Sequence, residues 1–73
     1  MTESELALIT RLSDTNPELR RLYSRHCEYE ERLDELKRSR WQSPEEYAET
    51  KKLKRAKLAG RDRMASILAM NAD

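Results

Sequence analysis

"NPELRRLYSRHCEYEERLDELKRSRWQSPEE", residues 16–46, contains the two signals that decide the fold. In each signal a residue with a side-chain acceptor precedes a proline: Asn16 stands before Pro17, and Ser43 stands before Pro44. This order is typical of a helix start, because the side chain caps free backbone N–H groups and proline lacks the N–H that would be unpaired there. The stretch therefore predicts two helices joined by a short turn.

The rest of the chain fits an all-α protein. Apart from the prolines, only one glycine interrupts the sequence after residue 16, so both helices are expected to be long. A short turn between two long helices requires an antiparallel arrangement, a helical hairpin. "TESELALITRL" predicts a short amphipathic helix ahead of the hairpin. The expected organisation is a short N-terminal helix and linker over 1–15 and a helical hairpin over 16–73, with helices at about 17–40 and 44–70.

Size and composition predict self-association. The chain has 73 residues, of which 40% are charged and 37% hydrophobic, and it contains no phenylalanine. This composition favours long, solvent-exposed helices over a thick core. A domain of about 60 residues buries only about 60% of the surface that its unfolded chain exposes. We therefore expect a homo-oligomeric helical bundle, a dimer or a higher assembly.

Apolar residues recur at spacings of three and four along the first long helix, as in a coiled coil. The second long helix has a broader apolar face. Faces this wide would leave apolar surface uncovered in a hairpin alone, so they are expected to pack on another copy or on the first helix. The predicted seam of the hairpin or oligomer consists of Leu19, Leu22, His26, Tyr29, Leu33, Leu36, Leu53, Leu58, Met64 and Leu68.

Two blocks, "NPELRRLYSRHCEYEERL" and "LKRAKLAGRDRM", resemble the signature blocks of the YdcH-like family, small bacterial proteins classed as a domain of unknown function. The resemblance implies a helical hairpin that self-associates, and it brings no catalytic residues. Gly60 departs from the pattern, which has leucine there, and Arg61 replaces a lysine. The matching positions are Asn16, Pro17, Leu19, Leu22, His26, Leu53, Lys54, Lys57, Leu58 and Asp62.

The net charge is only +1, so any electrostatic attraction to a partner must be local. In an antiparallel hairpin, position i is expected to face position 83 − i. The acidic segment 28–35 then neutralises the basic run in 48–55. At the other end, six cations have few acidic neighbours and form a candidate partner patch, which consists of Arg20, Arg21, Arg25, Lys57, Arg61 and Arg63.

Three interpretations of this patch stay open. Docking of an acidic protein partner is favoured over nucleic-acid binding, because the patch lacks interleaved aromatic residues and glycine-containing loops. A solvated helix end, neutralised by the acidic "TESE" segment of the same or a neighbouring chain, is the third.

His26 and Cys27, the only histidine and cysteine, do not predict a catalytic or metal site. Adjacent helical side chains diverge by about 100°, so His26 cannot activate Cys27 as a general base. No catalytic residue, cofactor or metal ion is predicted. We expect His26 to lie in the seam, bonded to Glu30 or to the other helix, and Cys27 to be semi-buried. A zinc site shared between subunits stays an alternative.

Aromatic residues and the glycine give further expectations. Trp41 is expected to cap the open end of the hairpin, in preference to serving as an exposed anchor for a partner. Tyr29 and Tyr47 are expected to pack in the core. By the register above, the ring of Tyr23 is expected to cover Gly60.

The sequence predicts a small, non-catalytic helical interaction or scaffolding protein that acts by self-association and partner docking. The alternative is a nucleic-acid-associated accessory protein that uses the basic patch. No signal peptide or membrane-spanning stretch is recognisable, and one cysteine cannot form an internal disulfide, so a cytoplasmic location is expected.

Overall fold

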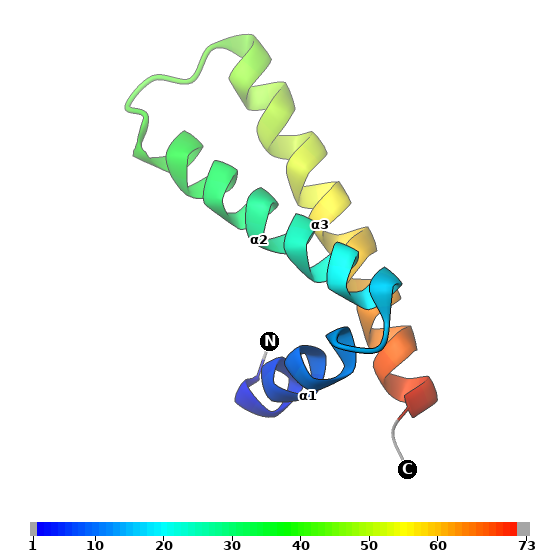
Figure 1. Cartoon of the computed structure of the whole chain (residues 1–73). Helices are drawn as coiled ribbons and strands as arrows, with labels where there is room; N and C mark the ends of the chain where they lie inside the picture. Colours follow the sequence, from blue (N-terminus) through cyan, green and yellow to red (C-terminus); the bar gives the residue numbers. More distant parts are fainter. Residues whose placement is uncertain (1, 72–73) are drawn as a thin grey trace.

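The fold is all-α, as the sequence predicts. The structure is a computed structural model, and it describes residues 2–71. Its three helices are α1 (Glu3–Ser13), α2 (Pro17–Arg38) and α3 (Pro44–Asn71), and the described residues contain no strand (Figure 1).

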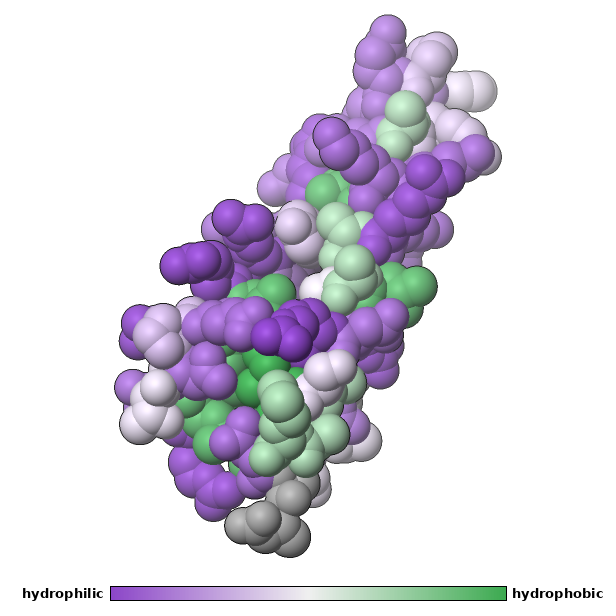
Figure 2. Space-filling view, turned by 90° about the vertical axis from the view of Figure 1, so that its right-hand side faces the viewer, coloured by the Kyte–Doolittle hydropathy of each residue, from purple (hydrophilic) through white to green (hydrophobic). Residues whose placement is uncertain are grey.

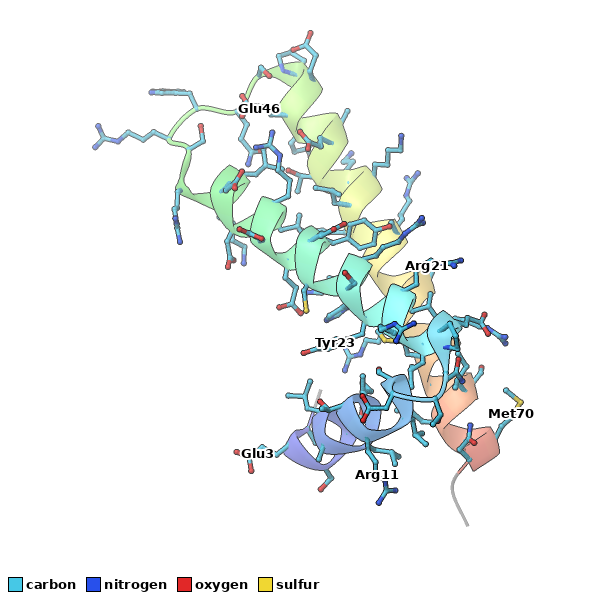
Figure 3. All side chains as sticks on the ribbon, viewed as in Figure 1. Glu3, Arg11, Arg21, Tyr23, Glu46 and Met70 are labelled. Carbon is cyan, nitrogen blue, oxygen red and sulfur yellow. The ribbon has the colours of Figure 1, made fainter. Side chains whose placement is uncertain are left out.

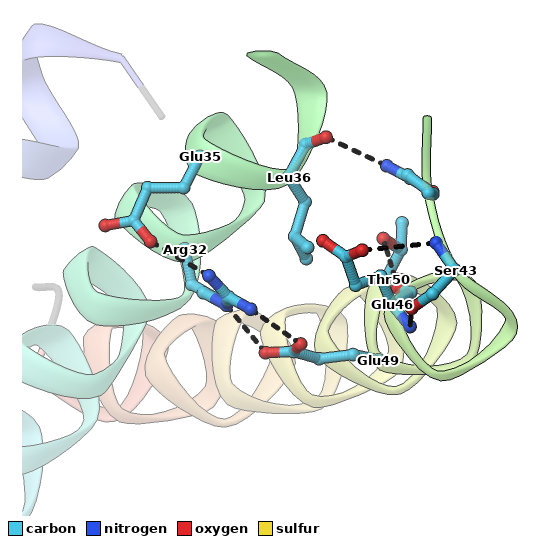
Figure 4. Close-up of polar contacts among 8 residues, drawn as sticks. Arg32, Glu35, Leu36, Ser43, Glu46, Glu49 and Thr50 are labelled. Atoms are coloured by element: carbon cyan, nitrogen blue, oxygen red, sulfur yellow. Dashed lines mark hydrogen bonds and ion pairs between the residues drawn. The ribbon is translucent and has the colours of Figure 1, made fainter. Parts of the chain in front are cut away.

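The predicted helix caps are confirmed. At the start of α2, the side chain of Asn16 accepts a hydrogen bond from the backbone N–H of Leu19 at 3.1 Å. At the start of α3, Ser43 and Glu46 form a reciprocal capping box: each side chain accepts from the backbone N–H of the other residue, both at 3.1 Å (Figure 4). Thr2 caps α1. Each helix therefore begins where a side chain satisfies backbone donors that have no partner within the helix.

The turn begins two residues earlier than predicted. Ser39 has φ −72° and ψ 126°, an extended conformation that ends α2 at Arg38. The side-chain amide of Gln42 donates to the carbonyl oxygen of Leu36 at 2.9 Å (Figure 4). This bond satisfies one of the carbonyl groups that a helix leaves free at its end.

Helices α2 and α3 lie side by side and run in opposite directions (Figure 1). Near the chain ends, the guanidinium of Arg63 donates to both carboxylate oxygens of Glu18, at 2.9 and 3.0 Å. Nearer the turn, Arg32 makes the same double contact with Glu49, at 2.8 and 3.0 Å (Figure 4). The numbers of each pair, 18 with 63 and 32 with 49, add to 81 rather than to the predicted 83. The third pair across the helices, Glu30 with Lys57, adds to 87, so the ion-paired side chains lie on both sides of the predicted sum and do not define one register.

The main core lies at the end of the molecule away from the turn. Helix α1 folds back below the N-terminal half of α2, beside the C-terminal part of α3 (Figure 1), and packs on the pair there. The core cluster consists of the buried residues Ile9, Leu19, Met64 and Ile67, with Leu12, Leu22, Tyr23 and Leu68 packed against it. Ile9 and Ile67, which are 1% and 2% exposed, lie outside the predicted seam. They are buried because α1 covers this end.

The molecule is elongated, with extents of 46 × 19 × 18 Å. Its radius of gyration is 14.2 Å, whereas about 11 Å is expected for a compact domain of this length. On the face that Figure 2 shows, hydrophobic atoms gather towards the end that carries the core cluster and thin out towards the turn. In the turn half, only Leu33 and Leu36 of the described residues of α2 are buried.

Three large apolar residues expected to be covered are exposed within the chain: Leu58 is 59% exposed, Tyr47 57% and Trp41 85%. The predicted core packing of Tyr47 and the predicted capping by Trp41 are therefore wrong, whereas Leu58, predicted for the seam of the hairpin or oligomer, stays free for an oligomer contact. Leu58 follows Leu53 by five residues, which places it about 140° around α3 from that residue. Tyr47 lies beneath the ammonium group of Lys51, 4.7 Å from the ring centre. Trp41 does not cap the turn, because Gln42 bonds the end of α2 instead.

The predicted cover of Gly60 by Tyr23 is also wrong. A Cβ atom built at Gly60 would meet no side chain and no other helix within 4 Å. Tyr23 instead packs against the core cluster and lies between α2 and α1 (Figure 3). Because Tyr23 packs there, its ring does not cover Gly60.

Candidate interaction surfaces

A groove of about 550 Å³ runs between α2 and α3 in the turn half of the molecule. Its apolar lining comes from Leu33 and Leu36 of α2 and from Tyr47 and Leu58 of α3. We call this hollow the α2–α3 groove. The remaining lining residues are Glu30, Asp34, Lys37, Gln42, Thr50, Lys54, Lys57 and Arg61.

The groove continues the face on which α1 packs. Tyr23 packs against the core cluster, and Glu30, seven residues later on α2, lines the groove. On α3, Leu68 packs against the same cluster, and Arg61, seven residues earlier, lines the groove. Helical residues seven apart lie on nearly the same stripe. One face of the α2–α3 pair is therefore covered by α1 at one end and left open as a groove at the other.

The two sides of the groove differ in charge. The α2 side carries the carboxylates of Glu30 and Asp34 together with Lys37. The α3 side carries only cations, which are Lys54, Lys57 and Arg61. Lys57 lies 3.6 Å from a carboxylate oxygen of Glu30. No other ion pair within 4.0 Å joins these six residues in the described part of the chain, so most of the charge faces outward.

The seam position of His26 is confirmed, and so is its bond to Glu30. The side chain of His26 is buried, and its Nε2 lies 2.6 Å from a carboxylate oxygen of Glu30. Its Nδ1 is buried without a hydrogen-bond partner. The ring of Tyr23 stacks on the ring of His26, with 6.4 Å between the ring centroids and 18° between the ring planes. The described residues hold no group of three His, Cys, Asp or Glu side chains placed to bind a metal ion.

The six cations of the predicted partner patch do not form one surface. Arg63 is paired with Glu18. Lys57 and Arg61 line the groove. The other three residues lie together on α2, around a shallow hollow that Pro17, Ser24 and Glu28 also line; they are Arg20, Arg21 and Arg25. The patch divides because arginines 20, 21 and 25 lie on a side of α2 that does not pack on α3. We call these three residues the outer arginine surface.

The predicted neutralisation of the basic run 48–55 is wrong for the described residues: none of its cations pairs with an acidic residue of α2, and the contact of Glu30 is with Lys57, outside that run. In the other two ion pairs across the helices, α2 contributes Arg32 to Glu49, and Glu18 to Arg63. The hydrogen bonds from Arg63 lower the pKa of Glu18, and those from Arg32 lower the pKa of Glu49. The segment 51–55 therefore keeps its cations in solvent, apart from the contact of Lys51 with a tyrosine ring.

Cys27 is exposed rather than semi-buried. Its contact with Tyr23 raises the pKa of the tyrosine hydroxyl, first through a side-chain hydrogen bond. The pair adds no general base beside the thiol, so it provides no arrangement for nucleophilic catalysis.

Comparisons with protein-family models, with curated proteins and with solved structures found no match to this chain. In the part of the chain that the structure describes, no helix has the length and apolar character that crossing a membrane requires.

Sequence reasoning missed the groove, although its signal is present. Tyr47, Lys54, Leu58 and Arg61 recur at helical spacing beside the seam of α3. In such a stripe large apolar residues alternate with cations. The pattern predicts an exposed surface beside the contact between the two helices, and not the contact itself.

Proposed function

We propose that this chain is a small, non-catalytic interaction protein that self-associates through its helices and presents a basic surface to a partner. The observation that carries this proposal is the uncovered apolar lining of the α2–α3 groove, where Tyr47 is 57% and Leu58 is 59% exposed. Contiguous exposed apolar surface rimmed by polar residues is typical of an interaction site. We also propose that the hairpin assembles into a bundle, as the YdcH-like resemblance implies, and that the protein is located in the cytoplasm.

The mass of the protein in solution tests self-association. Gel filtration coupled to light scattering, at tens of micromolar chain, is expected to give a mass above 8.7 kDa. Leu58→Asp should lower that mass, since it places a charge on the exposed apolar surface. Lys52→Asp is the matched control, because Lys52 lies on α3 outside the groove. A folded wild type that stays at 8.7 kDa rejects self-association.

The outer arginine surface supports partner docking. In the described residues, Arg20, Arg21 and Arg25 form no ion pair within 4.0 Å, and Glu28 is the one acidic residue beside them in the hollow. Three guanidinium groups on one exposed face suit carboxylate-rich protein segments, which they can bind through paired hydrogen bonds.

Nucleic acid is the second candidate partner, because guanidinium groups bind phosphates equally well. An anisotropy titration with duplex DNA and structured RNA near 0.15 M salt separates the two. We expect binding only at low salt and without sequence preference, as for nonspecific counterion release. Micromolar binding that Arg21→Glu with Arg25→Glu abolishes, and Lys52→Glu with Arg55→Glu does not, would make nucleic acid the partner.

A further inference from the structure

We infer that the occupant of the α2–α3 groove is a second copy of this chain, related by a two-fold axis that runs along the groove. This inference rests on the self-association proposed above, and it identifies the surface through which the two copies associate.

The opposite charges of the two sides of the groove favour this occupant. The α2 side presents Glu30 and Asp34, and the α3 side presents Lys54 and Arg61. A two-fold axis along the groove places α2 of one copy over α3 of the other, since such an interface uses the same surface on both partners. Each acidic side then faces a basic side. An acidic helix or a nucleic acid would meet repulsion along the α2 side instead, because all of its charges have one sign.

The apolar groove residues fit the same arrangement. Leu33 and Leu36 form the apolar part on α2, and the side chains of Leu58 and Tyr47 stand more than half exposed on α3. Two facing grooves bury these side chains against each other and make a four-helix core, which the chain alone lacks in its turn half. Since α1 occupies the same face of each copy at the other end, the two copies meet along the turn halves and diverge towards their α1 helices.

Charge reversal with mixing tests the inference. The acidic variant carries Lys54→Glu and Arg61→Glu, so both sides of its groove are negative. The basic variant carries Glu30→Gln and Asp34→Lys, so both sides of its groove carry net positive charge. Sedimentation equilibrium of wild type should give twice the chain mass of 8.7 kDa. Each variant alone should dissociate with a dissociation constant at least tenfold higher, and a one-to-one mixture should restore the dimer.

The control is Lys52→Glu with Arg55→Glu, which changes the net charge of α3 by the same amount outside the groove. Circular dichroism of every variant checks that the helices form. Suppose that wild type is an oligomer and that the acidic variant raises the dissociation constant no more than this control does. The groove is then not the interface, although self-association is supported. A wild type that stays monomeric rejects both proposals. If each variant alone loses the dimer and the mixture does not restore it, the acidic side of one copy does not face the basic side of the other.

Discussion

Single residues contribute very unequally to the stability of this chain, because so few of them are buried. Met64 and Met70 lie on the same helix, yet Met64 is 1% exposed and Met70 is 70% exposed. Met64 belongs to the core cluster, and Met70 points away from the other helices (Figure 3). The same side chain therefore has two different energetic roles within two turns of α3.

Truncation of the two methionines measures this difference. Met64→Ala should lower the free energy of unfolding by about 2–5 kcal/mol, through lost burial and the cavity left behind. Met70→Ala should change it by less than about 0.5 kcal/mol. Urea denaturation followed by circular dichroism gives both values. If Met64→Ala shows no cooperative transition, Met64→Leu should still fold, with a loss below about 1.5 kcal/mol. Equal losses at both positions would contradict the burial of Met64.

The bond between His26 and Glu30 joins a buried ring to an exposed carboxylate. A carboxylate accepts only, so a hydrogen bond over the 2.6 Å between these atoms requires a proton on Nε2 of His26. Glu30→Ala leaves this buried donor unpaired, which should cost about 1–3 kcal/mol. Glu31→Ala, on the exposed neighbour, is the control and should stay within about 0.5 kcal/mol. Chemical denaturation of both variants compares them, and a loss at Glu30 no larger than at Glu31 would argue against the bond.

At the scale of the elements, the start of α3 depends on one local device. Ser43 and Glu46 satisfy each other's backbone N–H groups directly after the turn. Ser43→Ala should destabilise the protein by about 0.5–2 kcal/mol, since it removes a helix cap. Ser24→Ala, at an exposed position inside α2, should cost less than about 0.5 kcal/mol. Thermal unfolding of the two variants provides the comparison, and similar midpoints would show that the cap contributes little.

The arginine–glutamate pairs between α2 and α3 make stability depend on acid. The pKa values of Glu18 and Glu49 are lower in the folded protein than the ordinary glutamate value of about 4.3. Their contribution is therefore fully present above that value and is lost as the pH falls through the folded pKa of each group. Glu18→Gln with Glu49→Gln should flatten the fall in stability below about pH 4.3. Urea midpoints between pH 2 and 7 measure how steeply stability falls with pH. The same fall in the variant and in wild type would contradict the prediction.

At the scale of the whole molecule, α1 completes the core, although it is the shortest helix. Ile9 is 1% exposed and lies in one cluster with Leu19, Met64 and Ile67. Removal of α1 uncovers these side chains together.

Deletion of residues 1–15 should therefore abolish cooperative thermal unfolding and increase the binding of a hydrophobic dye, because the remaining pair lacks its main core. Asn16 stays in place, so the cap of α2 is kept. Leu6→Ala, at a residue 36% exposed on α1, should retain the cooperative transition. A deletion variant that melts like wild type would show that α1 is dispensable for the fold.

The sequence predicts this fold well where the decisive signals are local. Asn16 and Ser43 act within one helical turn, so their caps can be recognised without knowledge of the tertiary structure. The positions of Leu58 and Tyr23 depend instead on the register between α2 and α3. The burial of Ile9 depends on how α1 packs, and the spacing of apolar residues in α1 alone does not indicate its partner.

The same dependence on the global arrangement explains the candidate surfaces. Arg20, Arg21 and Arg25 are close in sequence, so their grouping could be predicted. Their separation from Arg61 and Arg63 could not be predicted, because it depends on which side of each helix faces the other helix. The groove depends on this too, since Leu33 and Leu58 come from different helices.

The position of the core cluster also sets the order in which the protein can fold during its synthesis. Ile9 and Ile67 pack in the same cluster although 67 − 9, or 58, residues of chain separate them. The two can meet only after α3 has been made and has left the ribosome. Until then, α2 has only the short helix α1 as a partner from its own chain, and apolar surface left exposed on a nascent chain is prone to aggregation. The core therefore forms only after Ile67 has left the ribosome, and closing the long loop between Ile9 and Ile67 completes it.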